Sequence, residues 1–370
     1  MKILQIIPQL SSGGGERFTV DLCNELAERG HKVVLCVLYD LKDEKNSFYL
    51  PQVSKKVRVV SLNKKVGFDL GLFRKVNRLV KSEKPDVIHT HLRSLTYSFF
   101  VNRFHVKGVH TVHNDAAVES GDKISTFVRK YLFKGGYSQP VTISEVSRRS
   151  FVDFYKMDAP MIFNGRNIPA DLQVSNKVKA ECNSYRKNGK TRLIVHLAHL
   201  DNVKRQLLHA RVAKRLQNEG YNLGVLFIGS QRDSGYVEQV KAEMPECCHL
   251  LGQRTNPLEY LKESGAFALS SLYEGLPISL IEALGVGAIP ICTPVGGIVD
   301  LVKDGENGFL SSDLEEESFY QAEKRFLEMR DEELEQMRKK AFESYAPFSM
   351  TECAAKYEEV YKKVIDKKRQ

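Results

Sequence analysis

Residues 266–284 read AFALSSLYEGLPISLIEAL, and this stretch decides the fold. An apolar run of strand length ends in a polar loop at Ser270, and a second apolar run of helical length begins after Pro277. A short apolar strand that leads through a loop into a helix is the repeating unit of a parallel α/β sheet. The stretch therefore predicts one strand and one helix of such a sheet.

The same alternation extends through the chain on both sides of this stretch. Further strands are expected at 2–8, 33–39, 86–92, 106–114, 139–145, 192–200, 223–230, 247–253 and 288–294. Helices are expected between them, including 70–84 and 204–219. A chain of 370 residues exceeds what one hydrophobic core usually organises, so two domains are expected. The predicted fold class is α/β, with two Rossmann-like, doubly wound domains.

The domain boundary is marked by FNGRNIPADL at residues 163–172, where Asn, Gly and Pro interrupt the alternation. We place an N-terminal domain at 1–165 and a C-terminal domain at 166–348. Apolar residues make up 42% of the chain and charged residues 27%, which is an ordinary globular composition. No apolar run reaches about 18 residues, so no membrane-spanning helix is expected. The seven scattered cysteines form no CxxC pair, which indicates a reducing, cytoplasmic location.

The net charge of +9 is unevenly distributed. Residues 1–165 hold 26 Lys and Arg against 16 Asp and Glu, so the whole excess lies in the first domain. This predicts an anionic partner such as a membrane surface, a lipid-linked phosphate or nucleic acid. Basic and aromatic residues do not interleave as in nucleic-acid-binding segments, so nucleic acid is not expected.

Two predicted helices, 70–84 and 123–134, combine basic residues with an apolar stripe. Such helices can lie in the headgroup region of an anionic membrane. The alternative is that their apolar faces pack in the core while the charges face water. For 123–134 we favour the membrane, because this segment follows the loop that contains His113.

Two glutamates stand eight positions apart in the opening stretch. Glu274 ends the loop between strand and helix, and Glu282 is expected about two turns inside the helix. A hydroxyl-rich ligand at this helix N-terminus would meet two carboxylates and free backbone amides. The alternative, a solvated acid on a helix face, suits Glu282 poorly because apolar residues flank it in the sequence.

Two other loops that follow strands are candidates for phosphate binding. Gly14 and Gly15 lie in the loop SSGGGE, where glycines let backbone amides approach a phosphate; a plain tight turn is the alternative. This loop is neither GxGxxG nor a Walker A loop. The loop that begins at His199 supplies Lys204 and Arg205 as cations for a diphosphate, with a solvated basic turn as the alternative.

Four histidines follow or end neighbouring strands: His89, His91, His110 and His113. Four imidazoles at one sheet edge could bind zinc. The chain has no HExxH pattern and no cysteine pair to complete such a site, so we favour His113 as a hydrogen-bonding residue of a polar cleft. His89 and His110 then belong to the core, and no metal site is predicted.

Taken in order, these motifs resemble the retaining glycosyltransferases of family four, which have the GT-B fold. The resemblance runs through Gly13-Gly14-x-Glu16-Arg17, Gly30-His31-Lys32-Val33, Pro85-Asp86-Val87-Ile88-His89-x-His91, Val141-Thr142-Ile143-Ser144, Phe163-Asn164-Gly165, the E-x7-E pair, Gly296-Gly297 and Asp304-Gly305-x-Asn307-Gly308. It implies two domains facing each other across a cleft, acceptor on the first and nucleotide-sugar donor on the second. It also implies that a last helix, 349–370, returns to the first domain.

The resemblance further implies roles for particular residues. Glu274 would contact hydroxyls of the donor sugar, and Glu282 would hold the ribose. Lys204 would neutralise the diphosphate, and His113 would sit beside the anomeric carbon. The segment that lines the sugar and phosphate would be Gly275, Leu276, Pro277, Ile278 and Ser279, and Gly14 with Gly15 would close over the phosphates.

Two positions depart from the family pattern. Ala198-His199 stands where the family usually has Gly-Arg, so the arginine that clamps the diphosphate is absent. Either Arg205 replaces it, or donor binding is weaker, or the donor differs. Ser230 stands where a second glycine is common, close to the nucleotide.

The resemblance implies a retaining glycosyltransferase that needs no metal or other cofactor. The donor would be a UDP- or GDP-sugar, and the acceptor a glycan or lipid-linked molecule of cell-surface polysaccharide synthesis. The enzyme would be cytoplasmic, with peripheral attachment to the inner membrane. Two alternatives stay open: a nucleotide-sugar epimerase of the same fold, and a non-catalytic nucleotide-sugar-binding subunit.

Overall fold

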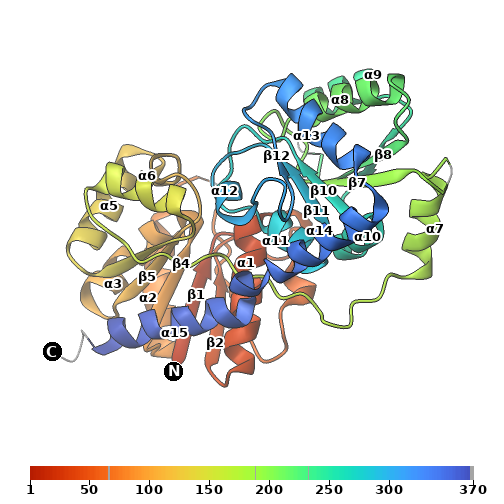
Figure 1. Ribbon diagram of the computed structural model, residues 1–370. Coiled ribbons are helices and arrows are strands. Elements are labelled where there is room, and N and C mark those ends of the chain that lie inside the picture. Colours follow the sequence, from red (N-terminus) through yellow and green to blue (C-terminus); the bar gives the residue numbers. More distant parts are fainter. Residues whose placement is uncertain (66, 188, 232, 367–370) are drawn as a thin grey trace. The chain divides into compact units, whose positions relative to one another are not determined.

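The computed structural model describes residues 1–65, 67–187, 189–231 and 233–366 (Figure 1). The chain divides into two compact units. Unit 1 is Met1–Asn167 together with the segment from Phe348 onward, and unit 2 is Ile168–Pro347. The sequence places the two boundaries after residues 165 and 348. Each unit contains one six-stranded parallel sheet within the described residues.

The sheet of unit 1 has the strand order β3-β2-β1-β4-β5-β6. Its strands are β1 Lys2–Ile7, β2 Lys32–Val37, β3 Arg58–Ser61, β4 Val87–His91, β5 Gly108–Val112 and β6 Ser138–Thr142. Its helices are α1 Gly14–Glu28, α2 Leu70–Glu83, α3 Phe99–Phe104, α4 Ala116–Ser120, α5 Lys123–Lys134, α6 Glu145–Tyr155 and α15 Met350–Asp366, and a 3-10 helix, η3 Leu92–Ser98, follows β4.

The two faces of this sheet differ in chemistry because successive side chains of a strand point to opposite sides. On one face Leu4 and Ile88 join a buried apolar cluster with Leu72 and Val76 of α2. On the other face Gln5 and its neighbours carry polar side chains that are fully buried. A buried polar row of this kind needs hydrogen-bond partners, and α15 supplies them.

Helix α15 packs on unit 1, beside α1 (Figure 1). The Tyr361 hydroxyl lies 2.7 Å from His89 Nδ1 and accepts a hydrogen bond from Gln5 Nε2 at 3.1 Å. The Tyr357 hydroxyl lies 2.7 Å from Thr111 Oγ1. Two tyrosines of the last helix thus satisfy the polar face of the sheet. Of the predicted helix 349–370, residues 367–370 lie outside the described part of the chain.

The sheet of unit 2 has the order β12-β11-β10-β7-β8-β9. Its strands are β7 Arg192–Leu197, β8 Leu223–Ile228, β9 Cys248–Gly252, β10 Ala266–Leu269, β11 Ile289–Cys292 and β12 Phe309–Leu310. Its helices are α7 Asn176–Ser184, α8 Gln206–Asn218, α9 Ser234–Glu243, α10 Pro257–Ser264, α11 Ile278–Gly285, α12 Ile298–Leu301, α13 Glu316–Glu328 and α14 Asp331–Glu343. Counted from its own first strand, this sheet has the same order as the sheet of unit 1.

The shared order is that of the Rossmann fold, and it confirms the predicted fold class. The order reverses between β1 and β4 in unit 1 and between β7 and β10 in unit 2. Ligands of such sheets bind beyond the carboxyl ends of the strands at these switch points. Every predicted strand is present, whereas β3 and β12 were not predicted. Both are edge strands, and β12 has only two residues.

The helices proposed for membrane docking differ in how their apolar residues are placed. In α2 the stripe packs inward: Leu72, Val76 and Val80 are buried. In α5, by contrast, Ile124 and Phe127 are exposed. Within the described ranges, no helix is both long and apolar enough to cross a membrane.

Candidate functional site

Two loops meet at the switch point of unit 2. The loop after β7 ends with Lys204 and Arg205, and the loop after β10 begins with Ser270. The Ser270 hydroxyl donates to the backbone carbonyls of Lys204 at 3.1 Å and Arg205 at 3.0 Å. The backbone NH of Leu272 donates to the carbonyl of Val203 at 2.8 Å. These bonds hold the two loops in a fixed register.

The centre of this site is an ion pair between Lys204 and Glu274. Lys204 Nζ lies 2.6 Å from Glu274 Oε1, and the hydroxyl of Ser271 donates to the same oxygen at 2.7 Å. The Glu274 side chain is 8% exposed and that of Lys204 20% exposed, so the pair is largely withdrawn from water. The structure therefore brings together two residues that the sequence assigned to one ligand. The pair can offer a cation and a carboxylate to the same polar molecule.

Glu282 lies on the helix that follows. Helix α11 begins at Ile278, so Glu282 is its fifth residue and stands just over one turn inside the helix. The expectation of about two turns was wrong, because the segment from Gly275 to Pro277 is an irregular loop and not part of the helix. Glu282 is buried, in agreement with its apolar neighbours in the sequence.

A third loop, after β11, closes against Glu274 from another side. The backbone NH of Gly297 donates to the carbonyl of Gly275 at 2.6 Å. Gly296 has a φ of +54°, and a Cβ atom there would stand 1.8 Å from the carbonyl oxygen of Glu274. No side chain fits such a contact, so glycine is required. The Gly-Gly turn thus fixes the backbone of the Glu274 loop.

The two departures from the family pattern contact each other. His199 Nδ1 lies 2.6 Å from the hydroxyl of Ser230, which a glycine at that position would not offer. The carbonyl of His199 accepts a bond from Gln206 Nε2 at 2.7 Å. The imidazole and hydroxyl therefore form one local unit at the ends of β7 and β8.

Arg205 shares the loop with Lys204, but its side chain is engaged elsewhere. Its guanidinium donates to the carbonyl of Leu314 at 2.5 Å, in the segment that precedes α13. The backbone of Arg205 is tied to Ser270, whereas its guanidinium is not brought to the carboxylate of Glu274. Whether Arg205 substitutes for the missing arginine at the diphosphate therefore stays a prediction.

His113 follows β5 in unit 1 and is buried. Its Nε2 lies 3.2 Å from His91 Nδ1, and His91 Nε2 lies 2.7 Å from Gln5 Oε1. Burial lowers the pKa of His113 to about 4, so its imidazole is neutral at pH 7. A neutral imidazole in this position can exchange hydrogen bonds with a ligand but carries no charge.

The loop that holds His113 is fixed by a buried carboxylate, Glu119, that the sequence did not predict. Glu119 Oε2 accepts bonds from the backbone NH of His113 at 2.6 Å and of Asn114 at 3.2 Å. Its Oε1 pairs with Arg129 at 3.1 Å. Burial opposes ionisation of Glu119, but the hydrogen bond from His110 and the charge of Arg129 bring its pKa to about 2. The position of Glu119 in the sequence carries no signal for this role.

Arg129 corrects the sequence-based picture of the segment 123–134. The charge pattern places it among the basic residues of a membrane-facing helix, but it is buried and donates to the carbonyl of Leu92 at 2.8 Å. The ion pair with Glu119 thus connects the loops that follow β4 and β5.

His89 and His110 have protein partners. His89 lies between Tyr361 and Thr111, at 2.7 and 2.8 Å, and His110 contacts Thr90 and Glu119 at 2.8 and 3.0 Å. Both are fully buried, as expected for core residues. Among the residues that the structure describes, no group of three or more His, Cys, Asp or Glu side chains is arranged to hold a metal ion.

Gly14 and Gly15 form the first turn of α1, which begins at Gly14, and so do not lie in the preceding loop. A Cβ atom on Gly15 would stand 3.1 Å from the Leu92 side chain. The loop after β4 therefore packs closely on this helix N-terminus. The nearby Ser11 hydroxyl donates to Glu16 at 2.7 Å.

A pocket of about 780 Å³ opens in unit 1. Residues that follow β1, β2, β4 and β5 line it, so it lies at the switch point of this sheet. Its lining comprises Pro8, Gln9, Glu16, Leu38, Tyr39, Lys64, Gly67, Phe68, Leu92, Arg93, Thr96, Tyr97, Asn114, Val118, Glu119, Asp122, Ile124 and Ser125. Its volume is in the range of small-molecule sites. The sequence indicated the strand ends but not the pocket.

Two parallel sheets in the same Rossmann order, with polar groups gathered at both switch points, define an α/β protein of two Rossmann-like domains. Residues 12–168 match the model of the family described as Glycosyltransferase Family 4. Residues 178–344 match the model described as Glycosyl transferases group 1. The chain therefore belongs to the family 4 glycosyltransferases.

Individual relatives are distant in sequence. The chain is 22% identical to an N-acetyl-alpha-D-glucosaminyl L-malate synthase of Bacillus anthracis, over 96% of this chain and 95% of that protein. It is 25% identical to a UDP-Gal:alpha-D-GlcNAc-diphosphoundecaprenol alpha-1,3-galactosyltransferase of Escherichia coli, over 73% and 72%. An uncharacterized glycosyltransferase of Methanocaldococcus jannaschii is 24% identical, and the match spans 59% of this chain and 58% of that protein.

Solved structures share the fold over nearly the whole chain. Anabaena HepE, in complex with UDP and glucose, is 18% identical and superposes with a TM-score of 0.82 over 98% of this chain and 100% of that chain. This likeness shows that the fold is GT-B.

Proposed function

We propose that this enzyme transfers a sugar from a nucleotide-sugar donor, held by unit 2, to an acceptor held by unit 1, with retention of the anomeric configuration and without a metal ion. The observation that carries the proposal is the buried Lys204–Glu274 pair at the switch point of unit 2. A nucleotide sugar combines an anionic diphosphate with sugar hydroxyls, and this pair offers one group for each.

Lys204 is the group that neutralises the departing diphosphate. It belongs to the same site as the N-terminus of α11, where free backbone amides also favour negative charge. Glu274 accepts hydrogen bonds from hydroxyls of the donor sugar, and Glu282 holds the ribose. The segment Gly275 to Ser279 lines the sugar and phosphate between them. The likeness to HepE, whose structure contains UDP, favours a UDP-sugar donor.

The reaction exchanges one bond at the anomeric carbon for another. The bond to the diphosphate oxygen breaks, the acceptor oxygen bonds to the same face of the sugar, and the proton of the acceptor hydroxyl leaves with the diphosphate. His113, which is neutral, lines the acceptor side through a hydrogen bond. Gly14 and Gly15 close over the phosphates. No protein nucleophile takes part in this route.

The acceptor belongs to the synthesis of a cell-surface polysaccharide and is a glycan or a lipid-linked molecule. Support comes from the names of relatives, one of which acts on a diphosphoundecaprenol-linked sugar. Another is named N-acetyl-alpha-D-glucosaminyl L-malate synthase, so acceptors vary among relatives of similar identity.

Unit 1 docks on an anionic membrane surface in this proposal, on the cytoplasmic side. Ile124 and Phe127 of α5 are 68% and 69% exposed. Lys123 and Lys130, on the same helix, have no carboxylate within ion-pair distance among the described residues. Exposed apolar residues flanked by unpaired cations favour the headgroup region of anionic lipid.

Incubation of the protein with UDP- and GDP-sugars, with and without acceptor, tests the function. A transferase forms the new glycoside only when acceptor is present. Conversion of the nucleotide sugar to its epimer without acceptor would establish the epimerase instead, and tight binding without any product would establish the non-catalytic subunit. Treatment with EDTA completes the experiment: full activity is expected, and loss that manganese restores would overturn metal independence.

A further inference from the structure

The pocket of unit 1 combines two kinds of lining that a purely sugar-binding site would not need. Lys64 and Arg93 bring positive charge to it, while Phe68, Val118 and Ile124 bring apolar surface. All five lie in unit 1, so the combination belongs to this unit by itself. Such a lining suits a molecule that is anionic at one end and apolar at the other.

The positive charge of Lys64 is held in place but not neutralised. Its described hydrogen-bond partners are the Tyr39 hydroxyl at 3.2 Å and the carbonyls of Lys65 and Gly67. Its ammonium also stands 4.7 Å from the centre of the Tyr39 ring and 5.7 Å from that of Tyr97. None of these partners carries a negative charge, so the ammonium remains able to bind an anion.

Arg93 is the second cation of the pocket and is exposed. It stands at the start of η3, directly after β4, and no carboxylate lies within ion-pair distance of it in the described part of the chain. A guanidinium binds two phosphate oxygens in a fork. The three acidic residues of the lining have partners of their own: Glu119 pairs with Arg129, Glu16 accepts a bond from Ser11, and the exposed Asp122 accepts bonds from the backbone NH groups of Ile124 and Ser125.

Three apolar residues of the lining are well exposed to solvent. Phe68, Val118 and Ile124 are 64%, 65% and 68% exposed although they are large and apolar. Phe68 is stacked on Tyr97 at 6.0 Å between ring centres, so aromatic surface continues from the exposed rim into the pocket. An isolated exposed apolar residue needs no explanation, but a group of them around one pocket indicates a binding surface.

We propose that this pocket binds the acceptor as a lipid diphosphate, with the diphosphate at Lys64 and Arg93 and the first isoprenoid-like units of the lipid against Phe68, Val118 and Ile124. This inference rests on the proposed transferase function and narrows its acceptor from a glycan or lipid-linked molecule to the lipid-linked class. The sugar on the diphosphate meets the polar residues Asn114 and Gln9 of the lining. Asn114 directly follows His113, so the acceptor hydroxyl is presented beside that residue.

Binding of farnesyl diphosphate to the full chain, measured by calorimetry at low salt, tests the proposal. Farnesol and inorganic diphosphate are the comparison probes, because each retains one end of the molecule. Farnesyl diphosphate should bind at least about tenfold more tightly than either. A single charge-assisted bond is typically worth about tenfold in affinity, so Arg93→Ala and Lys64→Gln should each weaken binding by about this factor.

Matched variants distinguish the loss of a lining residue from the loss of a similar charged or apolar residue outside the pocket. Arg78→Ala removes an exposed cation of α2 that does not line the pocket and should leave affinity within about twofold. Phe68→Ser should weaken binding about tenfold, since it removes an aromatic side chain that the lipid would cover. Phe104→Ser is its control, because Phe104 is also 64% exposed but lies outside the lining. Thermal denaturation of each variant checks that the fold is retained.

Several results would overturn the proposal. If inorganic diphosphate binds as tightly as farnesyl diphosphate, the natural ligand is a soluble anion. If both Arg93→Ala and Lys64→Gln bind farnesyl diphosphate as the wild type does, its site lies outside this pocket. Titration with UDP separates this inference from the transferase function. If UDP binds and sugar is transferred to a soluble acceptor while farnesyl diphosphate does not bind, only the lipid assignment fails. If the lipid binds as expected but no nucleotide sugar is turned over, the transferase function fails.

Discussion

The two units have sheets of the same order, yet their switch points are built differently. In unit 2 three loops are drawn together around the Lys204–Glu274 pair, and Gly296 allows backbone to approach backbone. In unit 1 the loops leave a pocket of about 780 Å³ with cations and aromatic rings in its lining. Strand order thus sets where a ligand binds, whereas the loops set which ligand it is.

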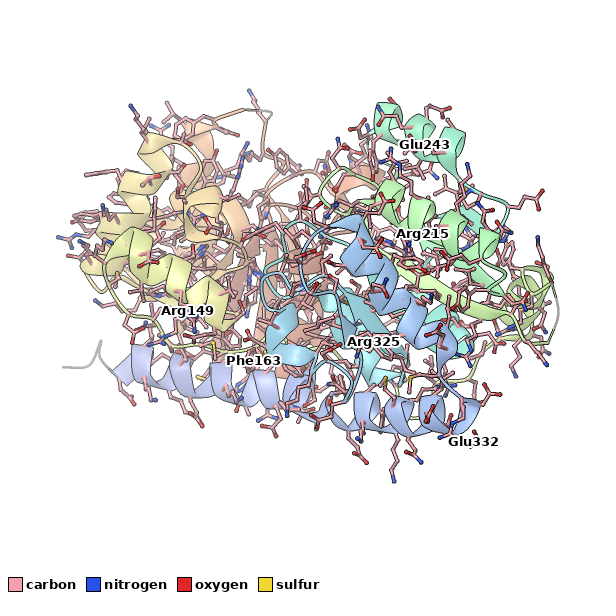
Figure 2. All side chains as sticks on the ribbon, turned by 45° about the horizontal axis from the view of Figure 1, so that its top comes forward. Arg149, Phe163, Arg215, Glu243, Arg325 and Glu332 are labelled. Atoms are coloured by element: carbon pink, nitrogen blue, oxygen red, sulfur yellow. The ribbon has the colours of Figure 1, made fainter. Side chains whose placement is uncertain are left out.

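The units also differ in how many of their surface charges are paired and in which polar side chains they bury. On unit 2 the outer helices pair their arginines with acids: Arg211 with Glu243, Arg215 with Glu317 and Arg325 with Asp304, some of which are labelled in Figure 2. On unit 1 several lysines and arginines of α2 and α5 have no such partner in the described ranges. Unit 1 also buries a cluster of four histidines, His89, His91, His110 and His113. Four experiments test these differences.

Acid should destabilise unit 1 before unit 2. Burial lowers the pKa of His89, His91, His110 and His113 below the usual 6.5, in the case of His113 to about 4. A group whose pKa is lower in the folded state stabilises the fold above its unfolded pKa and loses that contribution as the pH falls. As the pH falls from about 6.5 to 4, the change at His113 alone lowers the free energy of unfolding by about 3 kcal/mol. In unit 2 the pKa is lowered for His196 and for the half-buried His249.

Hydrogen exchange resolved by peptide, with pulses at about pH 7, 5.5 and 4.5, measures this difference. Peptides of β4 and β5 should lose protection at a higher pH than those of β7 and β8. Loss of protection in unit 2 first would contradict the expectation. Glu119 contributes in a lower window: its stabilising contribution is complete above the usual pKa of about 4.5 and is lost as the pH falls from there toward its pKa of about 2 in the fold.

Gly296→Ala should destabilise unit 2 by about 4 kcal/mol, since it adds a steric clash with Glu274 to the cost of a left-handed backbone. Gly220 is a matched control: its φ is +92°, and a Cβ atom there would meet nothing within 4 Å. Gly220→Ala should therefore cost only about 1 kcal/mol. Urea unfolding of both variants measures the difference. Equal losses would mean that the turn at Gly296 moves away from Glu274 without penalty.

Glu274→Gln should reduce kcat/KM for transfer about 100-fold, equivalent to about 3 kcal/mol, because the amide cannot replace the charge that Lys204 and the sugar hydroxyls meet. Affinity for UDP alone should change little, since the sugar contact is absent in that ligand. Glu332→Gln, an exposed acid of α14 labelled in Figure 2, is the control and should leave transfer unchanged. Steady-state kinetics at saturating acceptor measure both. Normal turnover by Glu274→Gln would show that Glu274 does not take part in the reaction.

Most of the fold could be predicted from the sequence because buried parallel strands are short, apolar and followed by helices. The two strands that were not predicted, β3 and β12, lie at sheet edges, where burial on both faces is not required. Arg58–Ser61 is only half-buried, and Phe309–Leu310 is too short to show any period. Glu282 was placed too deep in its helix because the sequence does not show where a loop around Pro277 ends.

The unit 2 site was accessible to sequence reasoning because its residues lie in the loops that follow strands. Lys204 and Glu274 stand beyond neighbouring strand ends, and the structure joins them at 2.6 Å. The ion pair between Glu119 and Arg129 was not predicted, because it depends on how α4 and α5 pack against the sheet. Arg129 stands among exposed basic residues in the sequence, and only the tertiary structure separates it from them. The His199–Ser230 contact was likewise hidden, since the two departures lie 31 positions apart.

The smallest effect concerns the membrane, and it distinguishes the exposed surfaces of the two units. Phe127→Ser and Ile124→Ser should each weaken binding to anionic phosphatidylglycerol vesicles about fivefold, since partial burial of either side chain in the headgroup region is worth about 1 kcal/mol. Phe342→Ser is the control: Phe342 is 55% exposed but belongs to unit 2, so binding should not change. Each basic residue near the lipid adds about 1 kcal/mol that salt screens, so wild-type binding should fall steeply as ionic strength rises. Vesicle sedimentation at low and high salt measures all of these. Equal binding to neutral phosphatidylcholine vesicles, or an equal loss in Phe342→Ser, would mean that α5 is not the docking surface.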